Sequence, residues 1–377
     1  MASLPTPEHR PAPHLRGEPI HVLVDSLADR ALTNAQMINA REIIRRLNPE
    51  RFHVSVFHMD EPDPRIVERP NTRLIHLPPH LKAIKIFKEF VAGRHHVLFY
   101  LKAAPASKWY LRLRPQWRDN RPVIGTVEAQ CDYYNEPTIR AAYMRLWQQT
   151  ILRSDYLFSN SNSVRKSLQA VFGRASEIVP TGVDTHFFTP AWERPANARL
   201  RVLFVGSLRI FKGPQVLLQA APRYRHADFI IVGAGSLALE LEARTERERL
   251  ANVHFTGNLD RERLRQEFQR ADVFFFPSYW EGSPRVILEA AASGLPVVAR
   301  RDYEPETVID GETGYLSSSD DEGIERLGEL LRRPDLRRSF GQASRKLAER
   351  FDWDAIVRRW EEIFLQVVSQ RASGHRS

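Results

Sequence analysis

The chain has 377 residues, which suits two domains of ordinary size, and 42% of them are hydrophobic, which excludes wholesale disorder. Its single cysteine, Cys131, excludes an intrachain disulfide and a multi-cysteine metal site, and it fits a reducing compartment. The formal net charge of +9 is uneven, because residues 1–190 carry +8 and residues 191–377 carry +1. No stretch approaches the roughly 18 consecutive apolar residues that span a membrane, so we expect a cytoplasmic protein.

The first half of the chain alternates strands and helices. Residues 1–18 are rich in proline and histidine and lack an apolar core, so they are expected to form a disordered tail and not a secretory signal. Residues 19–180 form the first predicted domain. Its expected strands are 20–25, 53–58, 72–77, 96–101, 122–126 and 156–159, and its expected helices are 34–47, 81–92, 137–152 and 163–172.

The second half repeats this plan over residues 200–350. Its expected strands are 201–206, 228–233, 253–257, 272–277 and 296–299, and its expected helices are 214–221, 236–245, 261–270, 285–293, 321–331 and 335–350. Apolar strands that alternate with helices are typical of parallel sheets covered on both faces. The predicted fold class is therefore α/β, with two Rossmann-like, doubly wound domains joined by an interdomain linker, 181–199. Because ligands of such sheets bind beyond the carboxyl ends of the strands, we expect the two domains to face each other across a cleft.

The segment 276–299 carries the clearest functional pattern. A buried strand ends at Pro277, a loop carries Glu281, and a helix containing Glu289 follows and ends before Gly294. Exposed amides at such a helix start bind anions, and ionised carboxylates accept several hydrogen bonds from sugar hydroxyls. Glu289 interrupts an otherwise apolar helix, which disfavours a purely solvated role.

A second pattern lies in the loop 205–213. A strand ends at Gly206, and Lys212 follows six residues later, just before a helix that begins with Pro214. A lysine at this place offers a point charge to phosphate. Arg209 is a candidate second cation or, equally, a solvated loop residue. Gly233 lies in a turn whose spacing does not match a dinucleotide fingerprint.

Glu281 and Glu289, separated by seven residues, resemble the E-x7-E signature of retaining glycosyltransferases of the GT-B fold, family 4. The resemblance covers most of residues 20–365. Further segments follow the family's order: 205–213 resembles its VGRLxxxKG loop, 230–235 its VGxG turn, 253–257 the strand that leads to the nucleotide base, and 180–190 its hinge pattern PNGVDxxxFxP.

The resemblance implies a metal-independent hexosyltransferase that moves a sugar from a UDP- or GDP-sugar to an acceptor hydroxyl with retention of configuration, and that needs no other cofactor. Glu281 would contact the donor sugar, Glu289 the ribose, and Lys212 the diphosphate. The last helix, within 351–377, would cross back to the first domain. The expected donor-binding residues are Gly206, Arg209, Lys212, Gly233, Gly282, Ser283, Pro284, Arg285, Val286 and Glu289.

The chain departs from the family pattern at three places. Ser207 stands where the family usually has arginine, and Asn34 and Ala35 stand where it often has two glycines at the acceptor side. Glu128 follows a strand where many members have a histidine that contacts the donor sugar, so it is a catalytic candidate that accepts a sugar hydroxyl or orients the acceptor, or else a plain loop carboxylate. These departures keep a non-catalytic sugar- or nucleotide-binding protein as an alternative.

Segment 81–121 holds ten basic and two acidic residues. Lys82, Lys85 and Lys88 form a basic stripe beside an apolar one on the expected helix 81–92. Such helices lie on anionic membrane surfaces. The alternatives are an ordinary domain helix with solvated lysines, or a nucleic-acid site, for which no recognised motif is visible. We therefore expect a peripheral protein at the inner face of the plasma membrane that glycosylates a lipid-linked or polysaccharide acceptor; a small soluble acceptor is the alternative.

Overall fold

The computed structural model describes residues 18–31, 34–131, 137–192 and 199–372, and it divides into two compact units. Unit 1 comprises residues 1–180 and 354–377, and unit 2 comprises residues 181–353. The expected tail lies outside the described residues, apart from Glu18.

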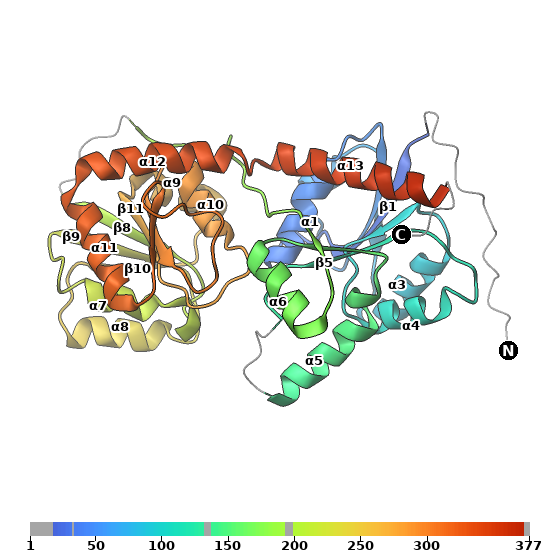
Figure 1. Ribbon diagram of the computed structural model, residues 1–377, viewed down its shortest axis with the longest axis horizontal. Coiled ribbons are helices and arrows are strands. Elements are labelled where there is room, and N and C mark those ends of the chain that lie inside the picture. Colours follow the sequence, from blue (N-terminus) through green and yellow to red (C-terminus); the bar gives the residue numbers. More distant parts are fainter. Residues whose placement is uncertain (1–17, 32–33, 132–136, 193–198, 373–377) are drawn as a thin grey trace. The chain divides into compact units, whose positions relative to one another are not determined.

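Unit 1 contains a parallel sheet of seven strands in the order β3-β2-β1-β4-β5-β6-β7. Its strands are mostly buried apolar runs, as the sequence predicts for a sheet covered on both faces. Figure 1 shows helices on both sides of it. The strands are β1 (Ile20–Leu27), β2 (Phe52–His58), β3 (Thr72–His76), β4 (Val97–Phe99), β5 (Val123–Val127), β6 (Tyr156–Ser159) and β7 (Glu177–Ile178).

The helices of unit 1 cover the two faces in separate groups. On β4, Leu98 packs in a cluster with residues of α3 and α4, whereas Phe99 contacts Trp360 and Phe364 of α13 at centroid distances of 4.8 and 5.0 Å. Neighbouring strand residues point to opposite faces, so α13 covers the face opposite α3 and α4. The helices are α1 (Ala35–Arg46), α2 (Pro64–Val67), η1 (Pro79–Leu81), α3 (Lys82–Val91), α4 (Pro105–Leu113), α5 (Pro137–Gln149), η2 (Ile151–Arg153), α6 (Asn162–Phe172) and α13 (Trp353–Ala372).

Unit 2 contains a parallel sheet of six strands in the order β10-β9-β8-β11-β12-β13, again between two helical layers (Figure 1). Its strands are β8 (Leu200–Val205), β9 (Ala227–Val232), β10 (Val253–Gly257), β11 (Val273–Phe276), β12 (Val297–Arg300) and β13 (Gly314–Ser317). Its helices are η3 (Ile210–Lys212), α7 (Pro214–Ala220), α8 (Ala238–Arg247), α9 (Arg261–Arg270), α10 (Arg285–Ala292), α11 (Asp320–Arg332) and α12 (Pro334–Glu349). The two-domain α/β prediction is confirmed.

The segment expected to be a linker, 181–199, is grouped with unit 2 where it is described. Val183 donates a backbone hydrogen bond to Phe351 and accepts one from Trp353, at 2.9 and 3.0 Å. Arg345 donates to the carbonyls of Thr185 and Phe188 at 3.0 and 2.9 Å. These bonds attach the segment to α12 and the residues after it.

Candidate nucleotide-sugar site

The predicted donor residues gather at the carboxyl edge of the unit 2 sheet. Strands β8 and β11 are neighbours, and β8 is where the strand order reverses direction along the chain. Such a switch point is the usual ligand position in an open parallel sheet. The loop after β8 carries Lys212, and the loop after β11 carries Glu281, so topology alone brings the two loops together.

Glycines allow the loops to approach closely. Gly213 has φ +73°, and a Cβ there would lie 2.3 Å from the carbonyl oxygen of Pro277. Gly233 has φ +134°, and its Cβ would lie 2.0 Å from the carbonyl oxygen of Gly206. Both positions require glycine, because a side chain would face left-handed strain and a backbone clash.

Lys212 and Glu281 form an ion pair in this edge. The Lys212 Nζ donates to Glu281 Oε1 at 2.5 Å, and the Ser278 hydroxyl donates to the same oxygen at 2.7 Å. Glu281 is buried, with 8% of its surface exposed, while the Lys212 side chain is 21% exposed. The Lys212 ammonium therefore keeps access to solvent. The hydrogen bonds from Lys212 and Ser278 together fix the direction of the Glu281 carboxylate.

Ser278 is a residue that the sequence analysis did not find. It is fully buried directly after β11, and its hydroxyl reaches Glu281 three positions later. The only sequence signal is a serine between a buried strand and a loop carboxylate, which is common in proteins.

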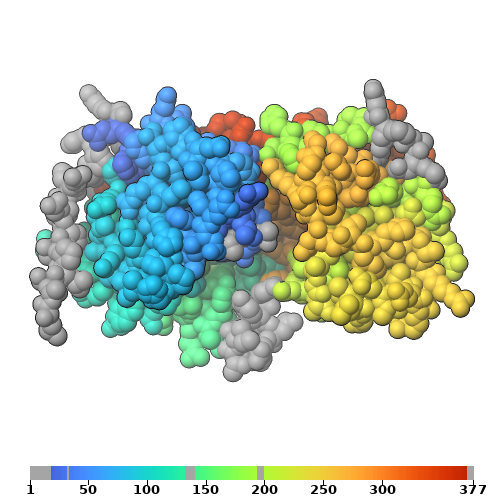
Figure 2. All heavy atoms as spheres, turned by 180° about the vertical axis from the view of Figure 1, so that it is seen from behind, coloured from blue at the N-terminus to red at the C-terminus, as the bar shows by residue number. Residues whose placement is uncertain are grey.

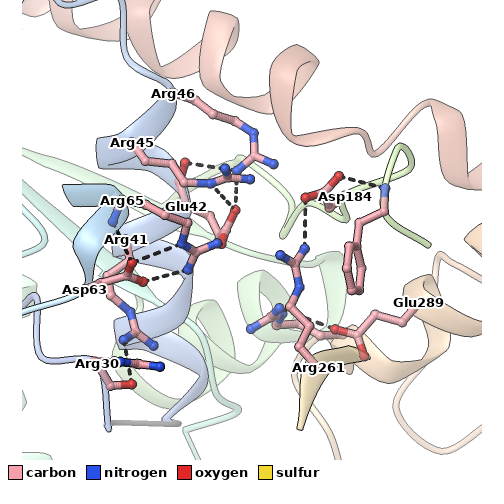
Figure 3. A network of polar contacts seen from close by, with 12 residues as sticks. Arg30, Arg41, Glu42, Arg45, Arg46, Asp63, Arg65, Asp184, Arg261 and Glu289 are labelled. Carbon is pink, nitrogen blue, oxygen red and sulfur yellow. Dashed lines mark hydrogen bonds and ion pairs between the residues drawn. The ribbon is translucent and has the colours of Figure 1, made fainter. Parts of the chain in front are cut away.

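Glu289 lies on α10. This helix packs its buried face in the core of unit 2. Its carboxylate pairs with Arg285, one turn earlier, at 3.3 Å, and Figure 3 shows it beside a guanidinium. Pro284 is the N-cap and cannot cap the helix with its side chain, so no side chain caps the amides of Arg285 and Val286, whereas the Ile287 amide donates to the Pro284 carbonyl at 3.1 Å. Gly294, with φ +74°, follows the helix end as expected.

The remaining predicted donor residues lie in the same two loops. Gly282 and Ser283 are half-buried before α10, and Val286 packs partly against the core of unit 2. Arg209 is exposed at the start of η3, and no hydrogen bond orients its side chain toward Lys212.

In unit 1, Glu128 is not an isolated loop carboxylate. It directly follows β5, accepts a hydrogen bond from Asn39 at 3.0 Å, and accepts another from the hydroxyl of Tyr100. Asn34 is the N-cap of α1 and accepts from the Gln36 amide at 2.9 Å. The sequence analysis placed Tyr100 inside the expected strand 96–101 and did not identify it as a site residue, whereas β4 ends at Phe99 and Tyr100 follows it.

The three lysines of α3 divide into two groups. Lys85 and Lys88 line a groove of about 530 Å³ between α3 and the edge strand β3. Lys82, at the first position of α3, acts electrostatically on the buried Asp25 of β1. The surroundings of Lys82 therefore differ from those of Lys85 and Lys88, and the basic stripe stays a prediction.

Another buried carboxylate, Glu42 on α1, has a structural role. It pairs with Arg45 at 2.8 Å, with Arg65 at 3.3 Å and with Arg46 (Figure 3). Burial acts to raise its pKa, but the arginines, Arg46 first, lower it below its ordinary value. This carboxylate is fully engaged in holding α1.

No group of three or more metal-ligating side chains occurs in the described parts of the chain. Among those residues, no helix is long and apolar enough to cross a bilayer.

Two family models match consecutive parts of the sequence. "Glycosyltransferase Family 4" matches residues 38–187, and "Glycosyl transferases group 1" matches residues 191–347. The chain belongs to the GT-B glycosyltransferases of the family 4 type. The first match lies almost wholly in unit 1, and the second lies in unit 2 around the site described above.

Curated relatives agree with this family. The D-inositol 3-phosphate glycosyltransferase of Corynebacterium aurimucosum is 31% identical over 253 residues, which is 59% of each chain. The sulfoquinovosyl transferase SQD2 of Arabidopsis thaliana is 32% identical over 193 residues, 47% of this chain and 37% of that protein. This GT-B chain thus aligns with about three fifths of the length of the first relative.

Solved structures share the fold. The sucrose-phosphate synthase of Thermosynechococcus elongatus superposes with a TM-score of 0.76 at 20% identity, over 93% of this chain and all of that one. The structure of Anabaena Alr3699/HepE in complex with UDP-glucose superposes with a TM-score of 0.74 at 17% identity, over 92% of this chain and 99% of that one.

Proposed function

We propose that this chain is a retaining glycosyltransferase that moves a sugar from a UDP- or GDP-sugar to an acceptor hydroxyl without a metal ion. The observation that carries the proposal is the arrangement of Lys212, Glu281 and Ser278 at the switch point of unit 2, with Glu289 on the adjoining helix. Support comes from the family membership and from a structural neighbour that was solved with UDP-glucose.

The chemistry follows from where charge develops. As the sugar–phosphate bond breaks, negative charge grows on the leaving diphosphate, and the Lys212 ammonium and the first-turn amides of α10 stabilise it. Glu281 holds the sugar hydroxyls while the ring gains oxocarbenium character, and Glu289 binds the ribose. The acceptor oxygen bonds to the anomeric carbon from the face that the diphosphate leaves, and its proton passes to a donor phosphate oxygen. The reaction is accelerated because these groups bind the transition state more tightly than the ground state.

A thermal-shift screen of UDP- and GDP-sugars tests donor binding, because a ligand that binds only the folded protein raises the melting temperature. We expect one nucleotide class to stabilise the wild type, equally with and without EDTA. Lys212→Ala should lose most of the shift, whereas Lys346→Ala, an exposed lysine of α12, should keep it. No shift with any nucleotide-sugar would contradict the proposal. A rise in melting temperature without sugar transfer to any acceptor extract would favour the alternative of a non-catalytic sugar- or nucleotide-binding protein.

We further propose that the acceptor is lipid-linked, in envelope polysaccharide or glycolipid synthesis, and that unit 1 binds the inner face of the plasma membrane. Leu81 and Ile84 are 44% and 55% exposed beside Lys85 and Lys88, and Trp109 on the packed neighbour α4 is 50% exposed. Part of the basic segment 81–121, in light blue to cyan, lies on the face of unit 1 seen in Figure 2. Apolar side chains flanked by cations suit an anionic bilayer surface.

Flotation with phosphatidylglycerol vesicles tests this surface. Replacing both Lys85 and Lys88 by glutamate should abolish binding, because each cation near an anionic surface contributes about 1 kcal/mol. The matched control replaces Lys166 and Lys346, which are exposed on other helices. Wild-type protein that does not float with these vesicles would favour a small soluble acceptor.

A further inference from the structure

A polar cluster lies at the carboxyl edge of the unit 1 sheet, where β1, β4 and β5 are neighbours. Tyr100 directly follows β4 with φ +65°, a backbone conformation that is uncommon and strained for a bulky residue. This backbone turn points the buried ring toward Glu128, whose carboxylate accepts the phenol proton. Asn39 holds the other carboxylate oxygen at 3.0 Å. The Glu128 carboxylate, which is half-buried, is thus fixed in direction with part of its surface open to solvent.

The second half of the cluster is a half-buried cation, Lys102, beside a buried carboxylate, Asp25. The Lys102 Nζ lies 4.9 Å from the Tyr100 ring centroid and 3.2 Å from the Gln36 side-chain oxygen. The Lys102 amide donates to the Asp25 carboxylate at 2.8 Å. Burial raises the pKa of Asp25 to about 6, and burial lowers the pKa of Lys102 to about 8.

Among the described residues of the cluster, carboxylates and ammonium groups are equal in number. Asp25 and Glu128 contribute two carboxylates, and Lys102 and Lys82 contribute two ammonium groups, of which Lys82 acts on Asp25 across space. A phosphate site needs cations that are not already matched by carboxylates. A neutral hydroxyl needs one acceptor and one donor, which a carboxylate and a lysine supply.

We propose that Glu128 and Lys102 bind a hydroxyl of an electrically neutral polyol part of the acceptor, free or lipid-linked, with Tyr100 and Asp25 as positioning residues. Glu128 accepts a hydrogen bond from the hydroxyl, and Lys102 donates one to an acceptor oxygen. Tyr100 fixes the Glu128 carboxylate, and Asp25 keeps the Lys102 ammonium charged and in place. This inference rests on the proposed function, and it differs from a site that recognises the acceptor through a phosphate.

The test compares transfer of labelled sugar from UDP-glucose or GDP-mannose to neutral polyols and to their phosphates, using myo-inositol, glucose, inositol 3-phosphate and glucose 6-phosphate. We expect the wild type to use a neutral polyol with a kcat/KM at least about tenfold higher than its phosphate. Lys102→Met and Glu128→Gln should raise the KM for that polyol about tenfold or more and leave the donor Kd within about twofold. Tyr100→Phe should lower kcat more than it weakens donor binding, a split that general destabilisation would not produce.

Controls and outcomes separate this inference from the proposed function. Lys166→Met and Glu177→Gln, exposed in unit 1, should behave as the wild type. A preference for the phosphorylated probes, transfer to none of the neutral polyols by protein that binds donor, or an unchanged polyol KM in both variants would overturn the inference. A wild type that binds neither donor would overturn the proposed function instead.

Discussion

Ser278 shows how a single buried hydroxyl can set the direction of a site carboxylate. Its hydrogen bond to Glu281 is 2.7 Å long and fully shielded from water. A bond to a charged group contributes about 1.5–3 kcal/mol. Ser278→Ala should therefore lower kcat/KM for the nucleotide-sugar about tenfold or more, measured by steady-state kinetics.

The matched control is Ser293→Ala, which removes a buried hydroxyl at the end of α10 that has no hydrogen-bond partner among the described residues. That variant should keep wild-type kinetics. Equal losses in the two variants would mean that Ser278 acts only through stability.

Gly213 fixes the distance between the two site loops. Gly213→Ala would add left-handed strain and place a Cβ 2.3 Å from a backbone oxygen, so it should cost about 2–4 kcal/mol of unfolding free energy. Gly311 has a similar φ of +76°, but nothing lies within 4 Å of its Cβ position. Gly311→Ala should cost only about 1 kcal/mol. Urea unfolding of both variants checks this; equal costs would contradict the close approach of the loops.

Asp25 gives stability a defined pH dependence. Its pKa is about 6 in the folded protein because burial raises it, against about 4 in an unfolded chain. The folded state therefore binds more protons between these values, and the free energy of unfolding falls as pH rises from about 4 to about 6. Asp25→Asn should remove this contribution, whereas Asp321→Asn, exposed on α11, should not. Urea unfolding across this pH range measures how the free energy of unfolding depends on pH. The same pH dependence in the wild type and in Asp25→Asn would contradict this prediction.

At the scale of elements, α13 is the cover of one face of the unit 1 sheet. Trp360 is 4% exposed and contacts Phe99 and Phe158 at centroid distances of 4.8 and 5.1 Å. Trp360→Ala would leave a cavity that the sheet cannot fill, at a cost of about 3–5 kcal/mol. Arg358→Ala, exposed on the same helix, should change stability by less than about 0.5 kcal/mol. Thermal unfolding checks both; a small effect at Trp360 would mean that α13 is detached in solution.

The elements differ in how well the sequence predicts them. Strand β11 and most of β8 are apolar runs, and the sequence predicts both strands close to their observed bounds. The sequence analysis missed β13, a four-residue strand at the sheet edge with a glycine and a serine, and α4, whose aromatic and basic residues hide its buried face. Short or mixed segments take their structure from packing, which a single sequence does not display.

At the scale of the whole molecule, topology explains which site residues were predictable. Glu281 and Lys212 follow neighbouring strands, so the sequence indicates one site for both, although their ion pair depends on loop shape. Of the acceptor cluster, the sequence analysis named Glu128 and Lys82 but not Tyr100 or Lys102 as site residues, because these two matter through a positive φ and through their tertiary surroundings. The roles of these residues stay predictions.

The most direct test of the central claim is nucleotide-sugar turnover with the product anomer read by NMR. Wild-type protein should transfer the sugar with retained configuration. Lys212→Ala and Glu289→Ala should each lower kcat/KM about 100-fold or more, because each loses a charged contact made at the donor. Lys346→Ala and Glu349→Ala, exposed on α12, are the matched controls and should retain wild-type rates. Unchanged turnover in both site variants, or a product of inverted configuration, would contradict the account.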